Sequence, residues 1–169
     1  AWGRQSRFAG SKDRAALRDL VFDALRRRSS CAAMGGGLHG RGLMLGLGRQ
    51  QGWDVAAVFS GTGYAPEALT EREEALVAAP ASLTSAEAAD VPDWMWDQFQ
   101  EDLGEEAGIV ASQLRERAPL FLRVNQRRGS VDAAVASLAA DQVGAVAHEN
   151  VKGCLRVTQN ARRVQQSAA

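Results

Sequence analysis

The sequence predicts a mainly helical protein, with a bundle of short helices followed by a small, partial α+β module. Up to about residue 118, apolar residues recur at spacings of three and four, which is typical of amphipathic helices. Residues 120–124 then form a short apolar run of β-favouring type, which is entered through Pro119. Beyond that run the pattern is strand, helix, strand, strand.

The clearest helix is expected over residues 12–28, with Ser11 as its N-cap. Its apolar stripe consists of Ala15, Leu17, Leu20, Val21, Ala24 and Leu25. Further helices are expected over residues 43–51, 54–59, 70–79, 82–89, from 92 onward, and 105–117. Asp54 is expected to start the helix at 54–59, and Ile109, Val110 and Leu114 are the apolar residues of the helix at 105–117. Thr70 and Glu73 form a capping-box pattern, and Gly46 and Gly48 permit close helix packing.

The glycine-rich stretch 35–42 is interpreted as a turn between helices. It has neither the dinucleotide fingerprint nor the Lys-Ser/Thr pair of a P-loop, and no strand precedes it. His39 within it is given no catalytic role.

The α+β module is expected to contain strands over residues 120–125, 143–148 and 154–158, a helix over 131–142 that starts at Ser130, and the start of another helix over 160–166. This β-α-β-β order is part of a ferredoxin-like or RNA-recognition-like (RRM-like) module. The segment lacks the aromatic signature with which RNA-recognition modules stack bases. Its sheet face is therefore not expected to read bases.

Composition indicates an ordinary globular protein, since 46% of residues are hydrophobic and 24% are charged. No apolar run is long enough to span a bilayer. Cys31 and Cys154 lie far apart without paired spacing, which argues against a disulfide framework and a zinc site. We therefore expect a cytoplasmic protein with no membrane and no metal partner.

The net charge of zero hides a strong segregation of charge. Residues 1–52 carry ten basic and three acidic residues, residues 53–118 carry three and fourteen, and residues 119–169 carry seven and three. Basic ends around an acidic middle favour a polyanionic partner such as a nucleic acid, although the acidic middle could also neutralise the ends within one fold. The residues expected to contact RNA phosphates are Arg7, Lys12, Arg14, Arg26, Arg27, Arg28, Arg123, Asn125, Arg127 and Arg128.

Trp94 and its neighbour Trp96 have two possible roles. They could form a base-stacking platform or anchor a core at a domain junction. Their acidic surroundings favour the core role.

Two parts of the chain resemble known families. Residues 7–14, Arg-Phe-Ala-Gly-Ser-Lys-Asp-Arg, which run into the helix at 17–28, resemble the first helical segment of NusB-like RNA-binding domains. Residues 91–94, Val-Pro-Asp-Trp, followed by residues 117–125, Arg-Ala-Pro-Leu-Phe-Leu-Arg-Val-Asn, resemble the junction in bacterial 16S rRNA 5-methylcytosine methyltransferases of the RsmB/Sun (NOL1/NOP2/Sun) type. A weaker similarity continues to the end of the chain.

The resemblance implies a NusB-like RNA-binding domain over residues 1–104, and a connecting helix with a small α+β linker module over residues 105–169. It also implies a Rossmann-like methyltransferase domain that supplies the S-adenosylmethionine site and the catalytic cysteines. We expect that domain outside these 169 residues, which makes the chain a fragment. Neither Cys31 nor Cys154 has the family's Pro-Cys or Thr-Cys context, and no glycine-rich strand-to-helix turn is present. No catalytic or cofactor-binding residue is therefore predicted here.

The first functional hypothesis is that the chain binds small-subunit (16S) ribosomal RNA and positions it for its own C-terminal methyltransferase domain. A free-standing NusB-like regulator, which would bind RNA and a protein partner without catalysis, is the alternative, and the β-containing tail argues against it. In a third, purely structural hypothesis, the helical half only docks on its own catalytic domain.

Overall fold

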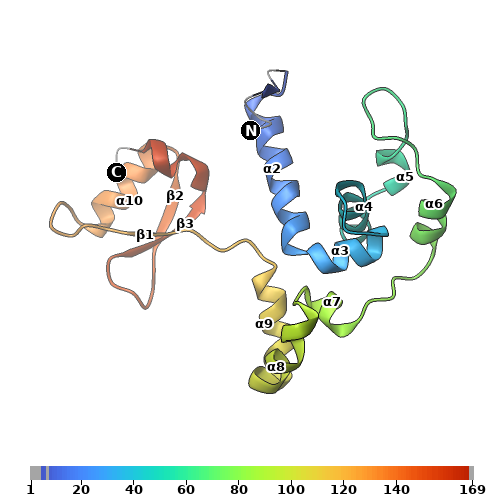
Figure 1. The fold of residues 1–169 in the computed structure, drawn as a ribbon. Coiled ribbons are helices and arrows are strands. Elements are labelled where there is room, and N and C mark those ends of the chain that lie inside the picture. Colours follow the sequence, from blue (N-terminus) through green and yellow to red (C-terminus); the bar gives the residue numbers. More distant parts are fainter. Residues whose placement is uncertain (1–4, 7, 168–169) are drawn as a thin grey trace. The chain divides into compact units, whose positions relative to one another are not determined.

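The computed structural model describes residues 5, 6 and 8–167. The chain forms two compact units, Ala1–Glu116 (unit 1) and Arg117–Ala169 (unit 2). Unit 1 is helical, whereas unit 2 holds a small antiparallel sheet with one helix (Figure 1). The predicted order of a helical half followed by β-α-β-β is therefore confirmed.

Unit 1 contains a series of mostly short helices. Their bounds are α2 (Ser11–Arg26), α3 (Arg28–Gly35), α4 (Gly40–Gln50), α5 (Val55–Val58), α6 (Glu71–Ala78), α7 (Ser85–Ala89), α8 (Asp93–Leu103), the 3-10 turn η1 (Gly104–Glu106) and α9 (Ala107–Leu114). The predicted capping box of α6 is present, because the Thr70 hydroxyl accepts from the Glu73 amide and the Glu73 carboxylate accepts from the Thr70 amide at 2.8 Å. His39 is the N-cap of α4, and its Nδ1 accepts from the Gly42 amide.

The predicted single helix over residues 12–28 is wrong at both ends. Gly10, not Ser11, is the N-cap of α2, and the Asp13 carboxylate accepts from its amide at 2.9 Å. Arg27 leaves the helical conformation, with φ −114° and ψ 35°, and α3 begins after it. No glycine or proline marks this break in the sequence. The change of direction at Arg27 allows α3 to pack against α4.

The contact between α3 and α4 depends on glycine. A methyl group on Gly46 would lie 1.9 Å from the Cys31 carbonyl oxygen, and one on Gly35 would lie 1.7 Å from that of Gly42. The two backbones therefore touch without side chains between them, which confirms the expected role of Gly46 in close packing.

Small clusters make up the core of unit 1. Cys31, Leu47 and Ala24 join α2, α3 and α4, and Leu45 packs with Val55 and Phe59. The third cluster joins α7, α8 and α9 through Ala86, Ala89, Val91, Trp96, Ala107 and Ala111.

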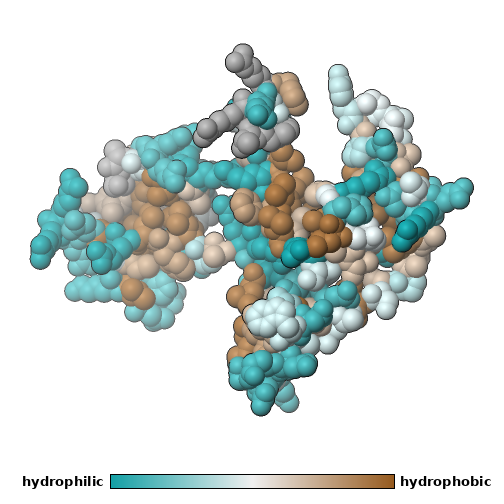
Figure 2. Space-filling view, in the orientation of Figure 1, coloured by the Kyte–Doolittle hydropathy of each residue, from teal (hydrophilic) through white to brown (hydrophobic). Residues whose placement is uncertain are grey.

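Several predicted core residues prove to be exposed. Trp96 is 8% exposed and anchors its cluster, but Trp94 is 80% exposed, because residues two apart on a helix point to different sides. In α9 the small residues of the third cluster face the core, and Ile109 and Leu114 are exposed. Three of the six residues in the predicted stripe of α2, Leu17, Val21 and Leu25, are also exposed, and Figure 2 shows apolar surface over this helix.

Unit 2 is built from β1 (Phe121–Arg123), α10 (Val131–Ala140), β2 (Gly144–Ala147), β3 (Cys154–Gln159) and the 3-10 helix η2 (Ala161–Gln166). The strand order is β1-β3-β2, and β3 is antiparallel to both neighbours. The strands β1 and β2 are thus parallel and separated by β3, which is the split β-α-β arrangement of ferredoxin-like folds. Ser130 caps α10, as predicted, since its hydroxyl accepts from the Ala133 amide at 3.1 Å.

One face of this sheet forms the core of unit 2. Leu138 of α10 packs with Val143, Leu155 and Val157, and partly buried side chains from β1 and η2 complete the cluster. Among the described helices of either unit, none is long and apolar enough to cross a membrane.

Candidate nucleic-acid interface

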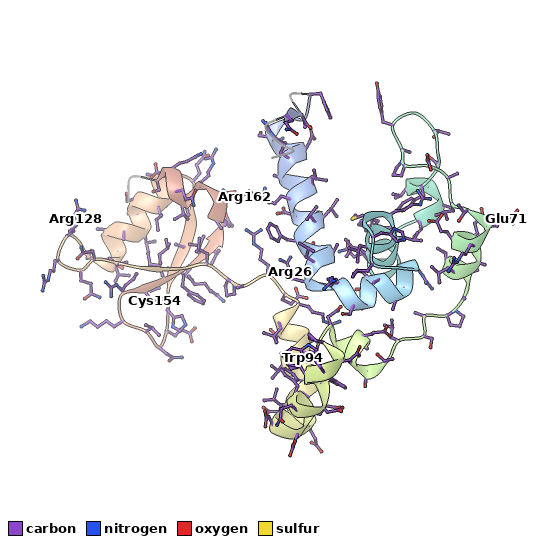
Figure 3. All side chains as sticks on the ribbon, viewed as in Figure 1. Arg26, Glu71, Trp94, Arg128, Cys154 and Arg162 are labelled. Atoms are coloured by element: carbon purple, nitrogen blue, oxygen red, sulfur yellow. The ribbon has the colours of Figure 1, made fainter. Side chains whose placement is uncertain are left out.

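The turn between β1 and α10, residues 125–129, is called here the basic turn. Asn125 organises it. Its side-chain oxygen accepts from the Arg127 amide at 3.2 Å, and its carbonyl oxygen accepts from the amides of Arg128 (2.9 Å) and Gly129 (3.3 Å). Asn is favoured at such positions because its short side chain can bond its own backbone two residues on. The Arg127 and Arg128 side chains are left exposed, and Figure 3 shows Arg128 at the tip of the turn.

Two cavities border the basic turn. The larger, of about 540 Å³, lies between the end of β1, the turn and α10, and its lining includes Arg123, Asn125 and Arg128 together with core side chains such as Leu122 and Leu155. The smaller, of about 300 Å³, is lined by Arg123, Val124, Asn125, Gln126, Arg127, Lys152 and Gly153. The four predicted site residues of unit 2 thus line one continuous region.

The positive charge of this region is not neutralised within the described part of the chain. The side chains of Arg123, Arg127, Arg128 and Lys152 make no hydrogen bond or ion pair with any described residue. Guanidinium groups with open donors suit phosphate oxygens, which they can bind through two parallel hydrogen bonds. The region therefore has the positive charge and the open donors that a phosphodiester backbone complements.

Sequence reasoning did not include Lys152 in the site. The antiparallel pairing of β1 with β3 brings it there, because the Val124 amide donates to the Gly153 carbonyl at 2.8 Å. The signal that could have found it is the register of these two strands, which the sequence alone does not give.

The predicted site residues of unit 1 have more varied surroundings. Lys12 and Arg14 are exposed near the start of α2, and Arg28 is exposed at the start of α3. Arg26 is paired with Asp23, so part of its charge is neutralised. Arg7 lies outside the described residues.

Arg27 has a structural role in unit 1. Its guanidinium donates to the Glu116 carboxylate at 3.0 Å and to the Arg115 carbonyl at 3.4 Å, which ties the start of α3 to the segment after α9. The structure thus gathers Arg123, Asn125, Arg127 and Arg128 in one place, whereas the candidate residues of unit 1 that the structure describes do not form a comparable cluster.

The two cysteines have different environments. Cys31 is fully buried, and burial, aided by the negative charge of Asp90, raises the pKa of its thiol to about 11. A thiol with that pKa is protonated near neutral pH and is a poor nucleophile. Cys154 is half-buried at the start of β3. Within the described residues, no group of three or more His, Cys, Asp or Glu is placed to hold a metal ion.

Comparison with protein families gives one finding. Residues 91–165 match the family model described as Methyltr_RsmF/B-like, ferredoxin-like domain. The match starts just before α8 and runs through the basic turn and the whole sheet into η2. It relates this part of the chain to the ferredoxin-like domain of RsmF/B-like methyltransferases. No curated protein matches the chain significantly.

Proposed function

We propose that this chain is the RNA-binding N-terminal region of an S-adenosylmethionine-dependent rRNA (cytosine-C5) methyltransferase of the RsmB/Sun type. In this proposal unit 1 is a NusB-like domain, unit 2 is the linker module, and the RNA is 16S ribosomal RNA. A methyltransferase domain outside these 169 residues holds S-adenosylmethionine and the catalytic cysteines. The observation that carries the proposal is an unneutralised basic turn within the segment that matches the RsmF/B-like family.

The basic turn suits the task of holding an RNA backbone. Asn125 fixes the turn through backbone bonds, so the two arginines at its tip extend from a preorganised loop. Contacts to phosphate position a nucleic acid without reading its sequence. The basic turn would thus bind the RNA backbone, while the methyltransferase domain selects the target base.

The two-unit structure also argues against the alternative hypothesis, a free-standing NusB-like regulator. A NusB-like domain is expected to end with its helices, whereas this chain continues into a sheet whose hydrophobic core includes Leu138, Val143, Leu155 and Val157. That module matches a methyltransferase family model, which favours the methyltransferase hypothesis over the regulator.

Salt dependence of RNA binding tests the proposal. The 169-residue chain is titrated into a labelled RNA stem-loop with single-stranded flanks, at several salt concentrations, and log affinity is plotted against log salt. The slope of this plot is negative, and each phosphate contact that is lost should reduce the magnitude of the slope by about 0.7 to 0.9. We expect the double variant Arg127→Ala/Arg128→Ala to lower it by about 1.5 and to weaken binding at every salt concentration.

Arg72→Ala is the matched control. Arg72 is an exposed arginine on α6, but it lies among Glu71, Glu73 and Glu74, so its loss should leave the slope unchanged. Asn125→Asp provides a second comparison, because it keeps the acceptor for the Arg127 amide and adds a negative charge beside the arginines. It should weaken binding without altering the fold. A slope that is the same in the wild type and the double variant would remove the basic turn from the site.

A further inference from the structure

The sheet of unit 2 has a second face, opposite α10, which the hydrophobic core does not use. Residues alternate along each strand, so Leu122, Leu155 and Val157 point to the core while their neighbours point away from it. This outward side is called here the open sheet face. It consists of Phe121, Arg123, Val146, His148, Cys154 and Arg156.

Strand register places these residues in two rows. Phe121 pairs with Arg156, which pairs in turn with Val146, so one row crosses all three strands. Arg123 pairs with Cys154, and the His148 amide donates to the Cys154 carbonyl at 2.8 Å, which makes the second row. The central strand thus carries an arginine flanked by an aromatic and an aliphatic residue.

Two rings meet on this face. The Phe121 and His148 ring centroids are 5.6 Å apart, and the ring planes are tilted by 58°. Phe121 is 46% exposed despite this contact. A large aromatic side chain held by a neighbour and still half open offers a π-face to a ligand.

The charge of the face indicates the kind of ligand. Arg123 and Arg156 are exposed, and neither makes a side-chain hydrogen bond or ion pair with any residue the structure describes. The three strands contain no Asp or Glu. An aromatic pair between two open arginines complements a ligand that has both flat rings and negative charge.

We propose that the open sheet face binds single-stranded RNA, with a base stacked on Phe121 beside His148 and the flanking phosphates held by Arg123 and Arg156. Stacking on aromatic side chains and cationic contacts to the backbone are the two components of single-strand binding. Duplex RNA cannot use this face in the same way, because its bases are already stacked. The inference rests on the proposed function and adds a second, base-stacking surface to the phosphate-binding basic turn.

The absence of the usual aromatic signature led sequence reasoning to discount this face. The structure shows a different arrangement: one ring comes from β1, and the other follows the end of β2. Their contact depends on the tertiary structure, since β3 pairs with both strands and holds them in one sheet.

Binding of the 169-residue chain to a 10-nucleotide single-stranded RNA, and to the duplex of the same sequence, tests the inference. Phe121→Leu keeps an apolar side chain but removes the ring, whereas Phe121→Tyr keeps the ring. We expect Phe121→Leu to weaken single-strand binding by roughly 5- to 150-fold, the range for one lost stacking contact, and Phe121→Tyr to bind as the wild type does. The duplex should bind more weakly than the single strand and should not distinguish the variants.

Trp94→Ala is the control, because Trp94 is an exposed aromatic residue in acidic surroundings on α8 (Figure 3). It should not change the affinity. An NMR measurement on the wild-type chain needs no variant: contacts between RNA base protons and the Phe121 ring protons are expected, and their absence in the bound state would overturn the inference even if Phe121→Leu failed to fold.

The outcomes separate this inference from the proposed function. If the wild type binds RNA and Arg127→Ala/Arg128→Ala lowers the salt slope, but Phe121→Leu binds normally, only the open sheet face is refuted. If the wild type binds neither the stem-loop nor the single-stranded RNA, both proposals fail. If Phe121→Leu weakens binding with an unchanged salt slope, stacking on this face is supported independently of phosphate contacts.

Discussion

Asp90 is the residue on which the helical packing of unit 1 should depend most. Its side chain is 2% exposed at the end of α7, where its carboxylate accepts from the Ser30 amide at 2.8 Å and from the Ser30 hydroxyl at 2.7 Å. Gln50 of α4 donates to the same hydroxyl at 2.8 Å, and Arg115, after α9, lies 3.5 Å from the carboxylate. This one side chain thus links α3, α4, α7 and the end of α9.

The magnitude follows from these contacts. Two hydrogen bonds to a charged group contribute about 1.5–3 kcal/mol each. Asp90 also has a positive φ of 55°, and a residue such as alanine in that conformation costs roughly 1 kcal/mol more. Because part of the lost bonding is recovered from water, we expect Asp90→Ala to lower the free energy of unfolding of unit 1 by about 3–5 kcal/mol.

Urea denaturation followed by tryptophan fluorescence measures this loss, since all four tryptophans lie within residues 1–116. Asp90→Asn tolerates the backbone conformation and keeps one acceptor, so it should lose about half as much. Asp97→Ala, at an exposed position on α8, should change the free energy by less than about 0.5 kcal/mol. If Asp90→Ala were as mild as Asp97→Ala, the proposed link between the helices would be wrong.

Three further predictions concern the fold. Gly46→Ala places a methyl group 1.9 Å from a backbone oxygen of α3 and should destabilise unit 1 by about 3 kcal/mol or more. Gly108→Ala on α9 is the control: its methyl group meets nothing within 4 Å and should stabilise unit 1 by up to about 1 kcal/mol. Urea denaturation measures both changes in the free energy of unfolding. The hydrogen bond from Arg41 lowers the pKa of Glu73 to about 2, so stability should be full above pH 5 and fall as the pH drops toward 2, and Glu73→Gln should flatten that decline. Ser130→Ala removes the N-cap of α10 and should cost about 1 kcal/mol, measured by hydrogen exchange in unit 2.

Local sequence signals predicted most of the elements. Thr70, Asp54 and Ser130 each cap the helix that was expected after them, because a side chain that satisfies the first amides of a helix acts within three residues. The strands of unit 2 were also found from short apolar runs between turns. Such local signals predict the structure correctly because they depend only on residues that are close together in the chain.

Features set by tertiary packing were not predictable in the same way. The break at Arg27 has no local cause, and it is fixed by α3 lying against α4. In α9 the periodic large residue Ile109 suggested the wrong core face, since the close contact with α7 and α8 selects Ala107 and Ala111 instead. The same holds for the candidate site: the cluster at the basic turn was predicted from adjacent residues, but Lys152 required the register of two strands.

We propose above that the basic turn of unit 2 contacts RNA. The most direct measurement is the change in amide chemical shifts of the isotope-labelled 169-residue chain when a 16S-derived RNA stem-loop is added. We expect the largest changes at residues 123–129 and 152–153, and the loss of those changes in Arg127→Ala/Arg128→Ala. Binding that shifts only amides of the helical unit, and leaves residues 123–129 unmoved, would contradict it.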